Sequence, residues 1–479
     1  MTPLADALAA IETGPSGPEV AAFFDFDGTL IDGYSAASYF ADRARRGEMD
    51  RAEAADVVRV SMHGDMDEDA FAAALVRSLA PWAGRPEKEL ADLWLRLFKQ
   101  RYGSRLYPGT WALVKAHQRR GHTVAIATSA MIYQVAPLAE ELEIADLLCT
   151  RPIVREGRLT GEIERPTPWG SGKAAAVRSF AAARGLDLSR CHGYANGDED
   201  LDFLQAVGHP TAINPGRRLA EVAGRQAWPV LRFPRHRAST LAKARTVAAY
   251  GLLAMAGLGG AAYGAVTGQR RRAAEQACAL GSDAILAVSG IRLEVEGQDH
   301  MWSHRPCVFM FNHQSLLDAF IMLKLMRHGF IGVAKKEAGR MPLLGRLVHA
   351  MEFVLLDRAD HRASVEALRP AIDRVRSGLC LGIAPEGTRS LTSRLGPFKK
   401  GGFHVALQAG VPIVPVVMCN TWQLVPRDSV VFRPGTVRVR VLPPIDTTGW
   451  SADRLDAHVA DVRARFQQAL DEDRASHPT

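Results

Sequence analysis

The sequence predicts an α/β protein of two unlike domains: an N-terminal, Rossmann-like doubly wound parallel sheet with a helical cap, and a second α/β domain after it. Two observations predict this class. Between residues 20 and 233, apolar runs typical of strands alternate with helical patterns, and the same texture resumes from Ile291 onward. The 479 residues suffice for two to three domains, and no internal repeat relates the two zones.

The expected strands of the first zone are VAAFFDFDG, TVAIATSA and HGYANGD. The stretch from about residue 34 to 107 contains no such run and is rich in Ala, Leu, Arg and Glu at helical spacing. We expect it to form an all-helical cap after the first strand. The expected strands of the later zone are IRLEVEG, CVFMF, LCLGIAP, VPIVPVVM and VRVRVLPP.

The charge balance is compatible with several classes of partner. Lys and Arg exceed Asp and Glu by 59 to 52, a surplus that suits nucleic acid, an anionic membrane or phosphorylated substrates. Nucleic-acid binding is not expected, because no helix-turn-helix, zinc finger or aromatic-basic signature is present. The 6 cysteines are scattered without a Cys-x-x-Cys pair, which favours reduced thiols in the cytosol over a zinc site. The N-terminus lacks a signal-peptide pattern, so we expect it on the cytoplasmic side.

Residues 234–277 form a basic-flanked hydrophobic segment. Its centre, Thr246 to Thr267, carries no charge, and arginines and lysines stand on both sides. The length permits one membrane span, but the Ala and Gly content makes insertion marginal. A single span would also place the two domains on opposite sides of the membrane, although both are expected to need cytosolic substrates. With Gly257, Gly259 and Gly260 at the centre, a membrane-associating helical hairpin or interfacial helix pair fits better, and a buried packing helix is the alternative.

Two carboxylates mark a first candidate site. Asp25 and Asp27 stand two residues apart at the end of an apolar strand, so both can reach one pocket at its carboxyl edge. Gly28 permits a tight turn there, and Thr29 can donate a hydrogen bond into the loop. Such a pair suits covalent phosphoryl transfer, in which one Asp attacks phosphorus and the other moves protons.

Residues 20 to 232 resemble the haloacid dehalogenase superfamily, in particular its phosphoserine-phosphatase-like branch (subfamily IB). The resemblance implies Asp25 as nucleophile and Asp27 as general acid and base. It implies that Thr128, in IATSA, holds the phosphoryl group, and that Lys173, in SGKAAAVRSF, steadies nucleophile and phosphate. It also implies that the cap closes over substrate and excludes water.

The last motif of this resemblance, YANGDEDLDFL, departs from the usual pattern. The best register places Asn196 where an acid is usual and Asp200 at the second acid; Asp198 and Asp202 are an alternative pair with the same spacing. Mg²⁺ is therefore expected among Asp25, Asp27, Asn196, Asp198 and Asp200, although an amide binds it less well than a carboxylate. The alternative is a degenerate domain that acts as a sensor or dimerisation module.

A second candidate site follows the strand CVFMF, in FNHQSLLD. His313 and Asp318 are separated by four residues, a spacing that lets the carboxylate reach the imidazole from the opening turn of a helix. The carboxylate would fix the tautomer and stabilise the imidazolium that forms in the transition state. His313 can then act as a base towards a hydroxyl nucleophile.

Residues 285 to 450 resemble the glycerolipid acyltransferases typified by lysophosphatidic acid acyltransferases. Four blocks occur in order: NHQSLLD, FVLLDR, PEGTRS and the strand VPIVPVV with Pro412 and Pro415, with FKKGG after the third. The resemblance makes His313 and Asp318 catalytic. The residues that it assigns to substrate binding are Arg358, Glu386, Gly387, Thr388, Arg389 and Lys399, with Lys400 as an alternative to Lys399. Glu386 either binds the acceptor or orders its loop.

Together the motifs predict a bifunctional phospholipid-synthesis enzyme. The expected organisation is a phosphatase domain at 1–233, the helical linker at 234–277 and an acyltransferase domain at 278–479. The C-terminal domain is expected to transfer an acyl group from acyl-CoA or acyl-carrier protein to 1-acyl-sn-glycerol 3-phosphate, giving phosphatidic acid. The N-terminal domain is expected to be a Mg²⁺-dependent phosphomonoesterase for a phosphoserine-like or lipid phosphate. The protein is expected to be located at the cytoplasmic face of the cell membrane. Homodimerisation is left open.

Overall fold

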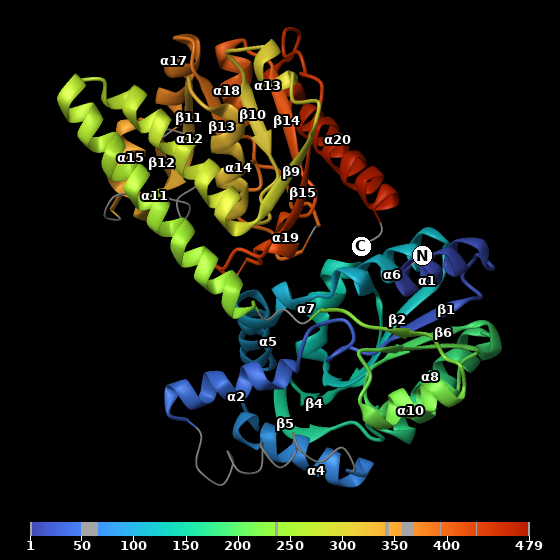
Figure 1. Ribbon diagram of the computed structural model, residues 1–479. Helices are drawn as coiled ribbons and strands as arrows, with labels where there is room; N and C mark the ends of the chain where they lie inside the picture. The colour runs from blue at the N-terminus through green and yellow to red at the C-terminus, as the bar shows by residue number, and fades with distance from the viewer. Residues whose placement is uncertain are drawn as a thin grey trace. The chain divides into compact units, whose positions relative to one another are not determined.

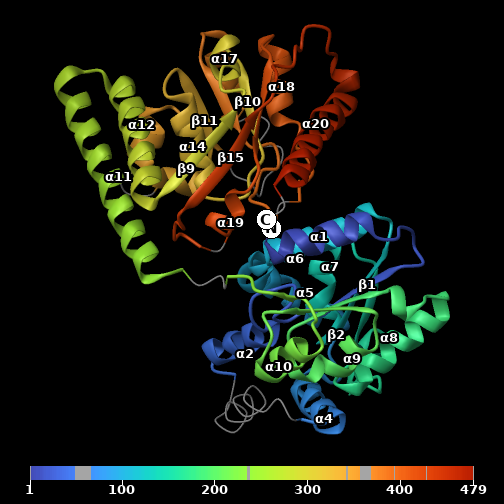
Figure 2. The same ribbon diagram turned by 45° about the vertical axis from the view of Figure 1, so that its right-hand side comes forward.

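The computed structural model describes residues 2–48, 66–234, 238–340, 344–356, 368–392, 394–427 and 429–477. The chain divides into two compact units, the first running to His236 and the second from Arg237 to Ser476. Each unit is built around a sheet of its own (Figures 1 and 2). The predicted α/β class is confirmed in both units.

The first unit holds a parallel sheet with the strand order β3-β2-β1-β6-β7-β8. β1 (Ala21–Phe24) is central and entirely buried, because its residues are all apolar and helices cover both faces of the sheet. In Figures 1 and 2, α1 and α6 lie on one face and α8 and α10 on the other. The chain order reverses beside β1, where doubly wound sheets open a crevice for ligands. The other strands are β2 (Thr123–Met131), β3 (Asp146–Thr150), β6 (His192–Ala195), β7 (His209–Ile213) and β8 (Val230–Leu231). The helices are α1 (Pro3–Thr13), α6 (Pro108–Arg119), α7 (Ile132–Leu142), α8 (Ser171–Arg184), α9 (Leu201–Gln205) and α10 (Arg217–Arg225), with the short turns η4 (Leu188–Arg190) and η5 (Asp198–Asp200).

The described residues of the insertion after β1 are helical. They form α2 (Ser35–Arg46), α4 (Glu68–Leu79) and α5 (Glu87–Leu97), with short turns η1 (Ala80–Trp82), η2 (Phe98–Tyr102) and η3 (Gly103–Arg105). A hairpin of β4 (Pro152–Arg155) and β5 (Arg158–Ile163), which the sequence did not predict, joins this cap. Gly84 N–H donates to the Leu159 carbonyl over 2.8 Å, and Leu159 N–H donates to the Arg85 carbonyl over 2.9 Å.

The second unit contains a mixed sheet with the strand order β12-β11-β13-β10-β14-β15-β9. All neighbours are parallel except β14 and β15, which are antiparallel. Two of its strands, β11 and β12, had not been predicted as strands. The strands are β9 (Ile291–Glu296), β10 (Val308–Phe311), β11 (Phe330–Lys335), β12 (Val354–Leu356), β13 (Cys380–Ile383), β14 (Ile413–Met418) and β15 (Gly435–Val441). The helices that follow β9 are α13 (His300–Ser303), α14 (Leu317–Met326), α15 (Leu344–Ala350), α17 (Arg369–Arg376), α18 (Gly401–Ala409), α19 (Thr421–Leu424) and α20 (Leu455–Ser476), with the short turns η6 (Lys336–Arg340) and η7 (Ala452–Arg454).

The hydrophobic segment forms one uninterrupted helix, α11 (Thr240–Thr267), which packs along α12 (Arg270–Ser289). A hairpin is therefore present, but the prediction that it turns at Gly257 to Gly260 was wrong. The chain turns at Gly268, which adopts a left-handed conformation with φ 72°. The central glycines instead allow close helix packing: a Cβ on Gly260 would lie 2.7 Å from the Ala277 Cβ. Among the described residues, α11 alone is long and apolar enough to cross a membrane by length and composition.

Candidate functional sites

The first site lies beyond the carboxyl end of β1 and is centred on a buried lysine. Lys173, in the first turn of α8, donates through Nζ to Asp25 Oδ1 over 2.8 Å and to Asp200 Oδ1 over 2.5 Å. All three side chains are buried. The two carboxylates sustain the positive charge, so the pKa of Lys173 stays above its usual value despite burial. The structure therefore brings together the predicted nucleophile, the predicted cation and the second acid of the last motif.

Asp27 lies in the same loop with a different electrostatic character. Burial raises its pKa to about 7, and the neighbouring Asp25 carboxylate also raises it. Ser35 opposes this shift, because its N–H and its hydroxyl donate to Asp27 over 2.8 and 3.0 Å. Gln134 in turn donates to the Ser35 hydroxyl over 2.9 Å. A carboxyl that titrates near neutral pH can both give and take a proton, which is what a general acid and base requires.

Asn196 follows β6 and occupies the centre of the oxygen cluster. With its amide nitrogen turned inward, Nδ2 lies 3.2 Å from Asp25 Oδ2, 2.8 Å from the Asp27 carbonyl oxygen and 3.0 Å from Thr29 Oγ1. A Cβ on Gly28, which has φ 81°, would lie within 3.0 Å of both terminal atoms of the Asn196 amide, so only glycine fits at this turn. The predicted site residue therefore contacts the loop of the nucleophile directly.

The other predicted residues of this site divide into two groups. Thr128 is buried near the end of β2, the strand beside β1, and its hydroxyl accepts from Ala130 N–H over 3.2 Å. Asp198 is directed elsewhere: its Oδ1 accepts from Leu219 N–H, in α10, over 2.7 Å. The best register, with Asn196 and Asp200, thus lies at the cluster, and Asp198 caps a neighbouring helix.

The second site lies where β10 ends and α14 begins. His313 Nδ1 and Asp318 Oδ2 are 2.9 Å apart, and Asp318 lies in the first turn of α14. The same carboxylate oxygen accepts from the N–H groups of Gln314 and Ser315 over 2.7 Å each. Asp318 is fully buried, whereas 19% of the His313 side chain is exposed. The carboxylate therefore fixes the ring and leaves Nε2 as the nitrogen that can take a proton.

The PEGTRS loop after β13 is hydrogen-bonded to the backbone of His313. Glu386 Oε1 accepts from His313 N–H over 2.8 Å, and Ser390 N–H donates to the His313 carbonyl over 2.7 Å. The other oxygen of Glu386 accepts from Gly396 N–H over 2.9 Å. Both oxygens of this buried carboxylate thus receive backbone N–H groups, an arrangement that orders the loop around the histidine.

The predicted cations have different surroundings. The Lys399 side chain lies over Gly387, whose hypothetical Cβ would be 3.1 Å from Nζ. The Lys400 ammonium instead pairs with Asp456 at 2.7 Å, and Arg389 immediately precedes the Ser390 that bonds His313. Thr388 is exposed in the same loop. Arg358 lies outside the described residues.

Sequence reasoning missed several residues that hold these sites together. Asn312 links β10 to β14: its amide donates to the Met418 carbonyl over 2.9 Å and accepts from Met418 N–H over 2.7 Å. Ser35 and Gln134 position Asp27, as described above. Asn312 could have been found from the sequence, because it lies within the motif FNHQSLLD beside His313, but Ser35 and Gln134 come together only through the fold.

Comparison with known proteins gives two family matches. Residues 22–205 match the model for haloacid dehalogenase-like hydrolases, and residues 292–419 match the model for acyltransferases. The 1-acyl-sn-glycerol-3-phosphate acyltransferase of Limnanthes alba is 36% identical over 176 residues, covering 36% of this chain and 62% of that protein. The chain thus spans about three fifths of the length of the curated acyltransferases it matches.

Two further similarities complete the comparison. A protein of Streptomyces azureus named inhibition of morphological differentiation protein is 32% identical over 228 residues, covering 46% of this chain and 80% of that protein. The crystal structure of the 1-acyl-sn-glycerophosphate acyltransferase from Thermotoga maritima aligns with a TM-score of 0.36 at 27% identity, covering 42% of this chain and 82% of that one.

Proposed function

We propose two activities for this chain, which belongs to the haloacid dehalogenase-like hydrolase family through its first unit and to the acyltransferase family through its second. The second unit transfers an acyl group from acyl-CoA or acyl-carrier protein to the sn-2 hydroxyl of 1-acyl-sn-glycerol 3-phosphate, giving phosphatidic acid. The first unit hydrolyses a phosphomonoester, either phosphoserine-like or a lipid phosphate. The observation that carries the proposal is the His313–Asp318 pair with the PEGTRS loop bonded to the histidine backbone.

Acyl transfer follows from the geometry of this pair. Nε2 of His313 takes the proton of the acceptor hydroxyl as its oxygen attacks the thioester carbonyl carbon. The C–S bond then breaks, and the proton passes from the imidazolium to the leaving thiolate. Asp318 stabilises the imidazolium between these steps, since its Oδ2 lies 2.9 Å from Nδ1. No acyl group is attached to the enzyme in this route.

The phosphate of the acceptor is bound by the cations of the PEGTRS loop and the segment after it. Ser390 is hydrogen-bonded to His313, so the neighbouring Arg389 is held close to the base. Lys399 lies over Gly387 in the same loop. Lys400 is the weaker candidate, because Asp456 already neutralises it. A guanidinium and an ammonium suit a phosphate monoester dianion, and Glu386 orders the loop that carries them.

Membrane attachment is assigned to one face of α11. Its exposed apolar side chains include Val247, Met255 and Val266, which are 73%, 67% and 87% exposed. Lys243, Arg270 and Arg272 at its two ends are exposed as well and suit anionic headgroups. A span is disfavoured, because α12 returns along α11 and carries Asp283, which pairs with Lys324 of α14 at 2.5 Å. We therefore propose that the helix lies in the cytoplasmic surface of the membrane.

Phosphomonoester hydrolysis uses the first site in two steps. An Asp25 oxygen attacks phosphorus while protonated Asp27 gives its proton to the leaving oxygen. Asp27, now a carboxylate, takes a proton from water, which attacks phosphorus and frees Asp25. Lys173, which donates to Asp25 Oδ1, neutralises the charge of nucleophile and phosphoryl group.

The residues of this site fit a Mg²⁺ ion. Asp25 Oδ2 and the Asp27 carbonyl converge on Asn196, whose amide can turn to present its oxygen. A carboxylate, a carbonyl and an amide are the hard oxygen ligands that Mg²⁺ accepts. When bound, the ion would neutralise phosphoryl oxygens. The amide nitrogen that now faces these oxygens also supports a second candidate function, a phosphatase-like fold that binds a phosphorylated molecule without turning it over.

One experiment tests both activities. Purified protein is incubated with labelled lysophosphatidic acid, with and without acyl-CoA, and the lipid products are identified. Acyl-CoA-dependent phosphatidic acid is expected from the second unit; monoacylglycerol or diacylglycerol would identify a lipid phosphatase. His313→Ala is expected to abolish phosphatidic acid and preserve phosphomonoester hydrolysis. Asp25→Asn is expected to have the opposite effect.

Four outcomes contradict the proposal in whole or in part. Absence of phosphatidic acid with every acyl donor tried would refute the acyltransferase assignment. Loss of both activities in His313→Ala, with an unchanged circular dichroism spectrum, would refute two separate sites. Phosphomonoester turnover that persists unchanged in Asp25→Asn would refute Asp25 as nucleophile. Absence of turnover in the unmodified protein with Mg²⁺ would favour the binding function for the first unit.

A further inference from the structure

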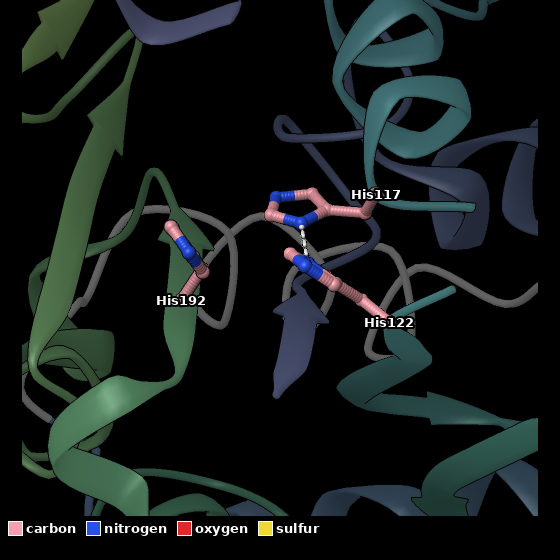
Figure 3. Close-up of side chains that lie close together, drawn as sticks. All are labelled: His117, His122 and His192. Carbon is pink, nitrogen blue, oxygen red and sulfur yellow. Dashed lines mark hydrogen bonds between the residues drawn. The ribbon is translucent and has the colours of Figure 1, made fainter. Parts of the chain in front are cut away.

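Three histidines meet at the amino end of the first sheet, and two of them are only five residues apart. His117 lies in the last turn of α6, His122 directly precedes β2, and His192 begins β6 (Figure 3). One ring nitrogen from each lies within 4.8 Å of those of the other two. The catalytic loop of Asp25 follows the opposite, carboxyl end of β1, so this cluster has no part in the activities proposed above.

Two of the rings already face each other. His117 Nδ1 and His122 Nδ1 are 2.8 Å apart, so in the absence of an ion they share one proton (Figure 3). The ring nitrogens of a tetrahedral zinc site, bound at 2.0–2.1 Å, lie about 3.3 Å apart, which small movements of these rings would reach. His117 and His122 are 0% and 7% exposed, so both donors lie in a protected pocket.

The outer nitrogens of this pair have the partners that metal-bound histidines use. His122 Nε2 lies 2.8 Å from the Pro15 carbonyl oxygen, and His117 Nε2 lies 2.8 Å from the Tyr194 hydroxyl. A ligating histidine commonly donates its second N–H to a carbonyl or another oxygen, which fixes the tautomer. With both Nε2 atoms protonated, both Nδ1 lone pairs point into the shared space.

The protonation state is also suitable. Burial and the neighbouring imidazoles hold the pKa of His117 well below its usual value, and burial lowers the pKa of His192 to about 4. Neutral imidazole is the form that binds metal ions. The groups that face the cluster are the Tyr194 hydroxyl, the Pro15 carbonyl and the ring of His209, which lies 4.8 Å from the His192 ring.

We propose that His117, His122 and His192 bind a Zn²⁺ ion, with His209 or a water as fourth ligand. Three imidazoles and no carboxylate favour Zn²⁺ over Mg²⁺. His192 is half-buried and His209 is exposed, which gives the ion a route from solvent. The ion would join α6 and the entry of β2 to β6, and through Pro15 the segment after α1.

The test is zinc binding by the full-length protein. Metal-free protein is dialysed against Zn²⁺ with millimolar Mg²⁺, which competes for the carboxylate site, and bound zinc is measured by mass spectrometry. About one zinc per chain is expected, with a melting temperature raised by about 5 °C or more at Zn²⁺ well above its dissociation constant. Co²⁺ in its place is expected to give the visible absorption of a tetrahedral nitrogen site.

Substitutions of single histidines test whether zinc binds at this cluster. His122→Gln and His192→Gln are expected to weaken zinc binding at least tenfold, while His192→Cys, which keeps a zinc ligand, retains it. His404→Gln, in α18 of the second unit, is the matched control and is expected to bind as the unmodified protein does. Circular dichroism checks that each variant folds. If His122→Gln and His192→Gln do not fold, zinc binding by His192→Cys tests the site instead. Protein that retains no zinc, or variants that retain it equally, would overturn the proposal.

Discussion

At the scale of single residues, different surroundings give identical carboxyl groups different roles. Asp27 is desolvated and close to another carboxylate, so its pKa rises to about 7 and it can carry a proton. Asp318 is fully buried, and its Oδ2 accepts from two backbone N–H groups and lies 2.9 Å from His313 Nδ1. One Asp is therefore suited to move protons and the other to orient the imidazole and stabilise imidazolium.

Asp318→Asn tests the second role. The amide keeps the volume but lacks the charge that stabilises imidazolium, so we expect the kcat of acyl transfer to fall by about 10²- to 10⁴-fold. The measurement is steady-state acyl transfer, with phosphomonoester hydrolysis by the same preparation as an internal control. Asp373→Asn, on α17, is a matched substitution that should leave both rates unchanged. A fall of less than threefold in Asp318→Asn would remove this residue from the catalytic pair.

The pKa of Asp27 predicts a pH dependence. Asp27 must be protonated to serve the leaving group, so kcat/KM for phosphomonoester hydrolysis should decline as the pH rises through about 7. Ser35 stabilises the carboxylate through its N–H and its hydroxyl, and Ser35→Ala removes the hydroxyl bond, so it should move this decline to higher pH. The same raised pKa means that the contribution of Asp27 to stability is present at acidic pH and is lost as the pH rises through about 7. If Ser35→Ala leaves the pH dependence of kcat/KM unchanged, the decline is due to the titration of another group.

Asn196 predicts weak Mg²⁺ binding. Asn196→Asp places a carboxylate beside Asp25 Oδ2 and the Asp27 carbonyl, and added ligand charge tightens binding of a hard cation. We expect the Mg²⁺ concentration for half-maximal phosphomonoester turnover to fall about tenfold. Asp198→Asn, at the residue that caps α10, is the control and should leave it unchanged. An unchanged or higher Mg²⁺ requirement in Asn196→Asp would place the ion away from this residue.

At the scale of elements, the sequence predicted what local patterns encode. β1, β2, β6, β9, β10, β13, β14 and β15 are short apolar or alternating runs and were expected, whereas β3, β7 and β8 were not. β12 is only Val354–Leu356, and β11 follows the apolar stretch of α14 directly, so neither interrupts the pattern as a separate run. The turn of the helical hairpin was misplaced because glycine signals both turns and close helix contacts, and only the fold tells these apart.

Neighbouring glycines in α11 separate these two uses. A Cβ on Gly259 meets nothing within 4 Å, whereas a Cβ on Gly260 would lie 2.7 Å from the Ala277 Cβ and 3.0 Å from the Ala273 carbonyl oxygen. Gly259→Ala should stabilise the second unit by up to about 1 kcal/mol through helix propensity. Gly260→Ala should destabilise it by about 1–3 kcal/mol through overpacking. Chemical denaturation measures both, and equal effects of the two substitutions would contradict the packing of α11 on α12.

At the scale of the whole molecule, the site residues fall entirely within one unit or the other. The phosphatase-like site draws on β1, β6 and α8, and the acyltransferase site on β10, α14 and the loop after β13. Each unit also has a core of its own around its own sheet. Motif order along the chain predicted both candidate sites, but the histidine cluster joins residues without a shared motif and was missed.

Separate expression of the two units provides the last prediction. Only residues 238–479 contain α11, with its exposed Met255 and Val266, so only this part should sediment with anionic phospholipid vesicles. Met255→Glu in the full chain should weaken vesicle binding about tenfold, because a charge replaces an apolar contact with the membrane. Glu294→Gln on β9, a substitution outside α11, should leave binding unchanged. Binding by residues 1–234 alone, or binding that Met255→Glu leaves intact, would locate the membrane contact elsewhere.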